Sequence, residues 1–178
     1  MKKLSVLVLI FLGIFGFSQV KWMTLSDALQ AQKTQPKKIL IYFYADWCGP
    51  CKLMDKNTYN HPVIAEQINQ NYYPVKFDAE SSESFSILGK TFNNPEFTSG
   101  NKKNSMHDFT KYMNVSSVPS LVFLDEQSNT ITILNGFLSA KEVEPYLSMI
   151  SGNDYKKFKT RQEWDDYQRK FRSKIKEK

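Results

Sequence analysis

The chain has 178 residues, of which 41% are hydrophobic and 24% are charged, so it is long enough to bury a core without disulfides. This composition is globular, and it excludes a disordered protein and a small disulfide-stapled scaffold. The formal net charge of +6 falls to +4 (6 − 2) without Lys2 and Lys3. Such a mild excess does not predict a nucleic-acid partner. We expect one domain with appendages at its ends.

Residues 1–18 have the layout of a secretory signal peptide. Two lysines precede an apolar run that begins at Leu4, and Gly16 and Ser18 are the small residues that a cleavage site requires. The alternative is an uncleaved membrane anchor, but the run is short for a span, which needs about 17–25 residues. We predict cleavage near Ser18/Gln19 and a periplasmic or secreted bacterial protein, in a compartment where disulfides persist.

The first half of the chain predicts two strands joined by helices. Helical spacing indicates an amphipathic helix over 24–34. Residues 39–45, ILIYFYA, are continuously apolar, which is typical of a strand buried on both faces of a mixed or parallel sheet. A helix then continues from Cys51, and residues 72–80 form the next strand, so the two strands are expected to be parallel.

A second helix is expected between Cys51 and that strand. Its N-terminal cap is predicted at Asn60, with Pro62 in its first turn. Later segments are a hairpin over 84–94, a loop, a helix over 105–113, two strands joined at 126–129, and a helix over 139–150 capped by Ser139. The sequence leaves the role of an insertion at about 81–104 open.

Residues 151–178 form a charged C-terminal extension. From residue 153 onward it contains ten basic and five acidic residues. Trp164, Tyr167 and Phe171 are spaced i, i+3, i+7, which predicts one more amphipathic helix with its aromatics facing the domain. Two interpretations stay open, namely a solvated helix packed by its aromatics and a basic patch for an acidic partner or an anionic membrane surface.

Cys48 and Cys51 are the only cysteines, and they lie in the motif WCGPC. A helix that starts at Cys48 brings the two side chains within disulfide distance. The first thiol then meets the unpaired N–H groups and the positive end of the helix, which lower a thiol pKa below about 8.5. We expect Cys48 to be an exposed nucleophile and Cys51 a more buried resolving thiol, as thiol–disulfide exchange requires.

Two other roles for the cysteine pair fit the sequence less well. A structural disulfide between residues three apart closes a very small loop and gains little from loop entropy. A structural zinc site needs four ligands, and beyond the cysteines the chain has only His61 and His107, without matching spacing. We therefore expect a redox centre, with no metal and no other cofactor.

Two stretches make the chain resemble the thioredoxin-like family. ILIYFYADWCGPCK resembles the strand and active-site turn of thioredoxin, and VSSVPSLVFLD resembles the segment that carries its cis-proline. The element order over about 38–150 also fits, and the leader and insertion resemble secreted bacterial members. The resemblance implies an α/β thioredoxin-like fold over 19–150, with a central mixed β-sheet flanked by helices.

The resemblance also implies site residues. Cys48 would be the nucleophile and Cys51 the resolving cysteine, Val118 would offer its backbone to a substrate strand, and Pro119 would be cis. Trp47 would either shape the rim of the site or pack locally as a surface aromatic. The active-site motif itself would comprise Trp47, Gly49 and Pro50.

The sequence departs from the family at one position. Thioredoxins carry a buried aspartate in the strand before the motif, which helps to deprotonate the resolving thiol, but the aligned residue here is Tyr42. Asp46 is expected to be solvated, and Asp78 to be a strand-end residue. The proton route to Cys51 is therefore an open question.

The resemblance implies a protein thiol–disulfide oxidoreductase, and the Gly-Pro dipeptide favours a reductant or isomerase. The alternatives are a disulfide-forming oxidase and a non-catalytic binding module whose cysteines form a structural disulfide; a peroxide-reducing enzyme fits the short CxxC motif less well. Expected partners are disulfide-containing or dithiol substrate proteins and, for a reductant in an oxidising compartment, a membrane-embedded electron donor.

Overall fold

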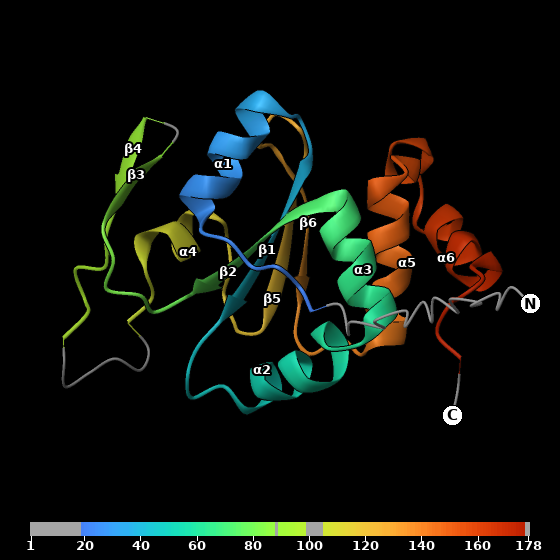
Figure 1. Cartoon of the computed structure of the whole chain (residues 1–178), viewed down its shortest axis with the longest axis horizontal. Coiled ribbons are helices and arrows are strands. Elements are labelled where there is room, and N and C mark those ends of the chain that lie inside the picture. The colour runs from blue at the N-terminus through green and yellow to red at the C-terminus, as the bar shows by residue number, and fades with distance from the viewer. Residues whose placement is uncertain (1–18, 88, 99–104, 177–178) are drawn as a thin grey trace, which may run out of the picture.

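The computed structural model describes residues 19–87, 89–98 and 105–176. A four-stranded sheet in the order β2-β1-β5-β6 has helices on both faces, and β3 and β4 form a separate hairpin (Figure 1). The strands are β1 Lys38–Tyr44, β2 Tyr72–Asp78, β3 Phe85–Ile87, β4 Lys90–Phe92, β5 Ser120–Leu124 and β6 Thr130–Asn135. The α-helices are α1 Leu25–Thr34, α2 Gly49–Met54, α3 Pro62–Asn71, α4 Asp108–Tyr112, α5 Ala140–Ser151 and α6 Arg161–Lys170.

Strand β1 is the central element of the sheet. It runs parallel to β2 and antiparallel to β5, so the sheet is mixed, as predicted. The register places Tyr42 opposite Lys76 on β2 and Leu121 on β5. Residues 39–43 are fully buried, which confirms a strand covered on both faces.

Alternate residues of β1 serve two different cores. Leu40 and Tyr42 pack in one cluster with residues of α2, α3 and α5. Ile39, Ile41 and Phe43 pack in the other with residues of α1 and α4. Successive side chains of a strand point to opposite faces, so one apolar run supplies both cores. The two cysteines belong to the first cluster, on the α3 and α5 face.

The crossover after the cysteines differs from the prediction at one cap. Helix α2 passes into a π-helical turn, Asp55–Tyr59, before α3 begins. The N-cap of α3 is His61 and not Asn60, and Pro62 occupies its first position. A proline disfavours the α region for the residue before it, so His61 takes an extended conformation (φ −73°, ψ 123°) and helical geometry starts one residue later.

The insertion contains the predicted hairpin, β3–β4. Gly89 has a φ of +72°, which a glycine adopts without strain at such a turn. Leu88 and residues 99–104 lie outside the described residues. The base of the insertion is held by Asn94, whose buried Nδ2 donates to the carbonyl oxygens of Ser81 (3.0 Å) and Ser105 (2.6 Å). The helix expected over 105–113 is shorter, because α4 begins only after the His107 cap.

The C-terminal extension is not one continuous helix, contrary to the prediction. A 3-10 turn, Asp154–Lys157, precedes α6, and residues 171–176 are not helical. Glu144 of α5 is buried and accepts hydrogen bonds from the Ser173 hydroxyl and from the Lys174 backbone N–H (2.8 Å). These two hydrogen bonds hold Ser173 and Lys174 against α5, and they take the place of the backbone hydrogen bonds that a continued helix would form.

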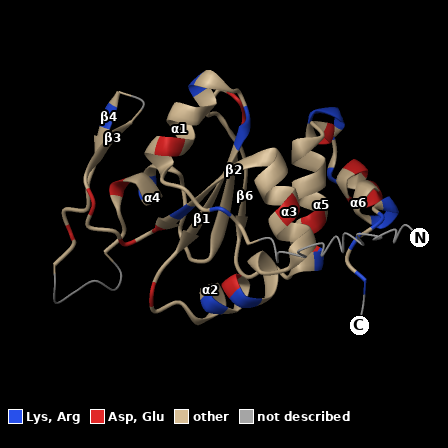
Figure 2. Ribbon diagram, viewed as in Figure 1, with Lys and Arg blue, Asp and Glu red and all other residues tan. Residues whose placement is uncertain are grey.

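The aromatic residues of α6 face the domain as predicted. The ring centroids of Trp164 and Tyr146 on α5 are 4.7 Å apart, and Trp164 stacks on Tyr167 at 5.6 Å. Phe171 continues the row, 6.0 Å from Tyr167. The aromatics thus attach the extension to α5, and the charged residues of α6 lie outward (Figure 2).

The expected signal peptide, residues 1–18, lies outside the described residues. The described chain begins beside α3, where Asn69 donates to the Gln19 carbonyl (2.8 Å) and accepts the Lys21 backbone N–H (2.9 Å). In the part of the chain that the structure describes, no helix is both long enough and apolar enough to span a membrane.

Replacement of Asn94 tests the attachment of the insertion. Asn94→Ala leaves two carbonyl groups without their donor, so we expect the free energy of unfolding to fall by about 1–3 kcal/mol. Asn93→Ala is the matched control, because that side chain is exposed. Urea unfolding measures both variants, and equal stability of the two would contradict the assigned role.

Candidate active site

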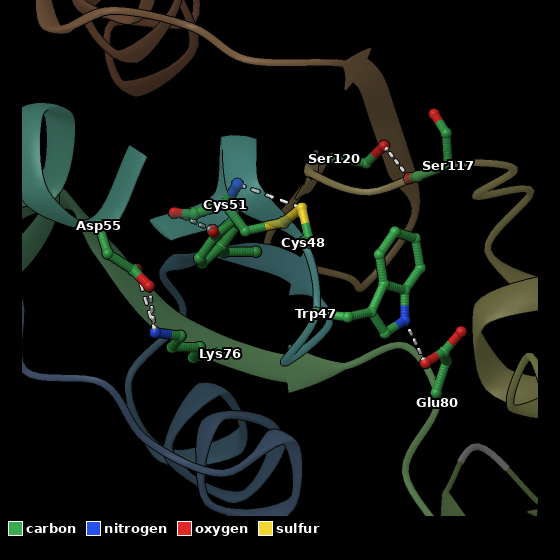
Figure 3. The surroundings of a disulfide bond; sticks show 9 residues. Trp47, Cys48, Cys51, Asp55, Lys76, Glu80, Ser117 and Ser120 are labelled. Atoms are coloured by element: carbon green, nitrogen blue, oxygen red, sulfur yellow. Dashed lines mark hydrogen bonds and ion pairs between the residues drawn. A yellow bond between two sulfur atoms is a disulfide. The ribbon is translucent and has the colours of Figure 1, made fainter. Parts of the chain in front are cut away.

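Cys48 and Cys51 form a disulfide at the N-terminus of α2 (Figure 3), with an S–S distance of 2.00 Å. Cys48 is the N-cap residue, and its Sγ accepts the backbone N–H of Cys51 (3.1 Å). An unpaired N–H at the start of a helix is therefore directed at this sulfur, as the motif predicted.

The prediction of an exposed Cys48 is wrong for this oxidised state, because each cysteine is only 1% exposed. The Cys48 backbone N–H donates to the Ala45 carbonyl (3.0 Å). This hydrogen bond holds the turn against the end of β1, so the cysteine is buried in the core. Little of the Cys48 surface is therefore accessible to a substrate in the oxidised protein.

Gly49 and Pro50 make the exposed first turn of α2. Pro50 has no N–H, and in the first turn of a helix that group would lack an intrahelical partner in any case. A Cβ at Gly49 would meet nothing within 4 Å. Space therefore does not require glycine here, and a small residue leaves room above the disulfide.

Trp47 has both of the features that the sequence left as alternatives. Its side chain is 48% exposed, yet its indole Nε1–H donates to Glu80 (2.7 Å). Glu80 is buried and lies just after β2, where its backbone N–H donates to Asp78 (3.0 Å) at the strand end. The ring is thus oriented at the rim by a fixed carboxylate, on the Cys48 side of the disulfide (Figure 3).

The Val118–Pro119 peptide bond is cis, as the resemblance implied. The Pro119 carbonyl accepts the Gly136 N–H (2.8 Å), whereas none of the described residues donates to or accepts from the main chain of Val118. The next residue after Gly136 is Phe137, which is 42% exposed. Sequence reasoning overlooked Phe137, because the bond from Gly136 to Pro119 that brings it to this segment joins residues that are far apart in the sequence.

The strand position that carries aspartate in thioredoxins holds Tyr42, which is fully buried. Its hydroxyl donates to the Cys51 carbonyl (3.1 Å). Burial raises the pKa of Tyr42, and the charge of Asp55 raises it further. The phenol is therefore a hydrogen-bond donor and not a proton acceptor at neutral pH.

Asp55 and Lys76 form an ion pair on the Cys51 side of the disulfide (Figure 3). The Lys76 Nζ lies 3.0 Å from both carboxylate oxygens. Sequence reasoning overlooked this pair, although Asp55 stands four residues after Cys51, a spacing that puts two side chains on one helical face.

Among the described residues, no three His, Cys, Asp or Glu side chains are grouped so that they could hold a metal ion. His61 caps α3, and His107 caps α4 with its Nδ1, which accepts the Phe109 N–H (3.0 Å). Both histidines therefore occupy structural positions at helix starts.

Comparison with known proteins matches residues 25–150 to the family model of the thioredoxin-like domain. The thiol:disulfide interchange protein DsbD of Haemophilus ducreyi is 24% identical over 119 residues, which are 65% of this chain and 17% of that protein. DsbD of Campylobacter jejuni is 30% identical over 120 residues, again 65% and 17%. The chain spans less than a fifth of the length of these two relatives.

Solved structures share the fold. A thioredoxin-fold protein from Helicobacter pylori superposes with a TM-score of 0.59 at 19% identity, over 75% of this chain and 83% of that one. A thioredoxin from Thermus thermophilus gives a TM-score of 0.55 at 15% identity, over 75% and 87%. With its mixed sheet, its helix-capping CxxC disulfide and its family match over 25–150, the chain belongs to the thioredoxin-like domain family.

Proposed function

We propose that this protein is a thiol–disulfide oxidoreductase that exchanges its Cys48–Cys51 disulfide with cysteines of substrate proteins. The observation that carries the proposal is the hydrogen bond from the Cys51 N–H to the Cys48 sulfur at the start of α2. In the reduced protein the same N–H stabilises a Cys48 thiolate, which is the attacking species in exchange. A purely structural disulfide does not require this hydrogen bond.

The direction that we propose is that of a reductant or isomerase. A strong oxidant of this kind owes its potential to a strongly stabilised reduced form. Here Cys48 Sγ accepts one hydrogen bond from the described residues, at the start of α2. Gly49 and Pro50 add no charge. This modest stabilisation of the thiolate favours the reducing direction.

Substrate proteins would dock beside the disulfide. The main chain of Val118 forms no hydrogen bond with the described residues, so it could bind an extended substrate segment, a short form of β-strand addition. Trp47 and Phe137 supply exposed aromatic surface for its side chains. The proposed substrates are therefore proteins that present a disulfide or dithiol in an accessible, extended stretch.

We propose that the predicted leader, residues 1–18, directs the protein to the periplasm or outside the cell. A reductant in such an oxidising compartment must be re-reduced after each turnover, because the surroundings do not supply electrons. We propose that a membrane-embedded protein is the electron donor. It would reduce the Cys48–Cys51 disulfide from the same side that substrates approach.

The end of the C-terminal extension supports the second interpretation of that segment, a contact with an anionic membrane surface. After α6 the residues alternate: Phe171 contacts Tyr167 and Ser173 bonds Glu144, whereas Arg172, Lys174 and Lys176 are exposed basic residues. An extended segment that is anchored on one side presents its cations on the other. We propose a weak electrostatic contact of this segment with anionic lipid.

The roles of the two cysteines can be separated by substitution. Cys48→Ser is expected to abolish reduction of a disulfide-containing peptide, because the attacking thiol is removed and the remaining Cys51 is buried. Cys51→Ser is expected to form a mixed disulfide with the peptide and stop there, because the resolving thiol is missing. Mass spectrometry under non-reducing conditions measures the adduct, and its formation by the Cys48→Ser variant instead would reverse the assignment.

The reduction potential of the Cys48/Cys51 pair tests the direction. Equilibration with glutathione followed by alkylation of free thiols should give a reduction potential of about −270 mV, as for reducing thioredoxins. A reduction potential of about −120 mV would identify an oxidant. Failure of the disulfide to exchange at all would support a binding module with a structural disulfide.

The membrane contact is tested with vesicles. Each basic residue near an anionic bilayer contributes about 1 kcal/mol, so replacing Arg172, Lys174 and Lys176 by glutamine should weaken binding by about 10²-fold. The matched control removes three exposed lysines of α1 and of the segment after Cys51, Lys33, Lys52 and Lys56. Equal losses in co-sedimentation with phosphatidylglycerol vesicles would show that only net charge matters.

A further inference from the structure

Cys51 has to lose a proton in every catalytic cycle, and its surroundings make that loss difficult. The residue is 1% exposed and packed in the apolar cluster with Met54 and Ala45. Burial in apolar surroundings raises the pKa of a thiol, so an unassisted Cys51 is protonated at neutral pH. The preceding strand supplies only the phenol of Tyr42, which donates to the Cys51 carbonyl.

Asp55 is the carboxylate closest to Cys51 along the helix. Its backbone N–H donates to the Cys51 carbonyl, so the two residues stand one helical turn apart. Side chains in that relation have Cβ atoms about 5–6 Å apart, which is close enough for one water molecule to link the two groups. Asp55 is half-buried, so such a water can exchange with solvent.

Lys76 fixes the position of this carboxylate. Its Nζ lies 3.0 Å from each Asp55 oxygen, and a carboxylate has further lone pairs that stay available to water. The β1–β2 register sets Lys76 opposite Tyr42, and Tyr42 bonds the Cys51 carbonyl. Three elements, β1, β2 and α2, therefore converge on the turn that contains Cys51, with the ion pair next to it (Figure 3).

The other ionisable groups that face this turn are poor proton acceptors. Burial raises the pKa of Tyr59, as it does for Tyr42, so both phenols keep their protons. Tyr44 lies under the Lys76 ammonium, 4.7 Å from Nζ to the ring centroid. The flanking Lys52 and Lys56 are exposed cations, which lack the lone pair that a base requires.

We propose that Asp55, held in place by Lys76, is the proton acceptor for Cys51 when the mixed disulfide is resolved. The proposal rests on the exchange reaction proposed above and adds a residue to it. Strand β1 has no carboxylate at Tyr42. In its place, Asp55 supplies a carboxylate from the helix, and Lys76 on the neighbouring strand holds it.

The resolving step balances as follows. Cys48 is first joined to a substrate sulfur, and the other substrate sulfur has left as a thiolate. The proton of the Cys51 thiol passes through water to Asp55, and the Cys51 thiolate attacks the Cys48 sulfur. The Cys48–Cys51 bond forms, the bond to the substrate breaks, and its thiolate takes a proton from solvent. The substrate disulfide is reduced by two electrons, the dithiol is oxidised, and Asp55 returns its proton to water.

The test is a stopped-flow reaction of the reduced protein with dithiobis(nitrobenzoate), which releases one coloured thiolate in each of two steps. The first release reports attack by Cys48 and the second reports resolution by Cys51. Asp55→Asn is expected to leave the first phase intact and slow the second by about 10²-fold at neutral pH. The second phase of the variant should rise about tenfold per pH unit, since deprotonation then depends on hydroxide, while the native rate changes far less with pH.

Two further variants serve as controls. Asp55→Glu keeps a carboxylate and should restore most of the second phase, whereas a merely structural role would show no such rescue. Asp46→Asn removes the same charge beside the motif, on the exposed side of the turn, and should leave the second phase unchanged.

An unchanged second phase in Asp55→Asn, with the first phase present, would overturn the inference and leave the proposed function intact. Absence of the first phase from the native protein would instead overturn the proposed function.

Discussion

The burial of β1 on both faces is the constraint on which the rest of the structure depends. Because its side chains alternate, one continuous apolar strand supplies the core under α3 and α5 and the core under α1 and α4. Its C-terminal end therefore has a fixed position and direction. The chain can leave that end only by turning into α2, and this turn carries Cys48 to a helix start.

The position of the disulfide determines the chemistry that is available to each sulfur. Cys48 lies at the helix start, where its sulfur accepts the Cys51 N–H, and the segment that contains Ser117 and Ser120 lies on its side of the disulfide (Figure 3). Cys51 lies one turn further in, against buried apolar side chains. The two identical side chains thus meet different environments, which separates an attacking thiolate from a thiol that needs help to lose its proton.

Local patterns predicted the elements well where one kind of interaction dominates. The apolar run of β1, the Ser139 cap of α5 and the aromatic row of α6 are all observed. The cap predicted at Asn60 was wrong for a local reason, the effect of Pro62 on His61, whereas the helix predicted for the C-terminal extension was wrong because neighbours in space compete with local preference. Glu144 forms hydrogen bonds with the residues that follow Lys170. The continuous helical spacing of the sequence could not indicate this contact.

The sequence by itself determined the CxxC motif and the buried central strand through spacing and residue type within short stretches, and its resemblance to the thioredoxin-like family implied the mixed sheet and the cis-proline. Only the tertiary structure decided that Cys48 is buried when oxidised, that Glu80 orients Trp47, and that Asp55 meets Lys76 beside Cys51. Each of those contacts joins residues from different elements. Such pairs are set by how the strands register and how the helices pack, and neither is encoded in any single stretch of the chain.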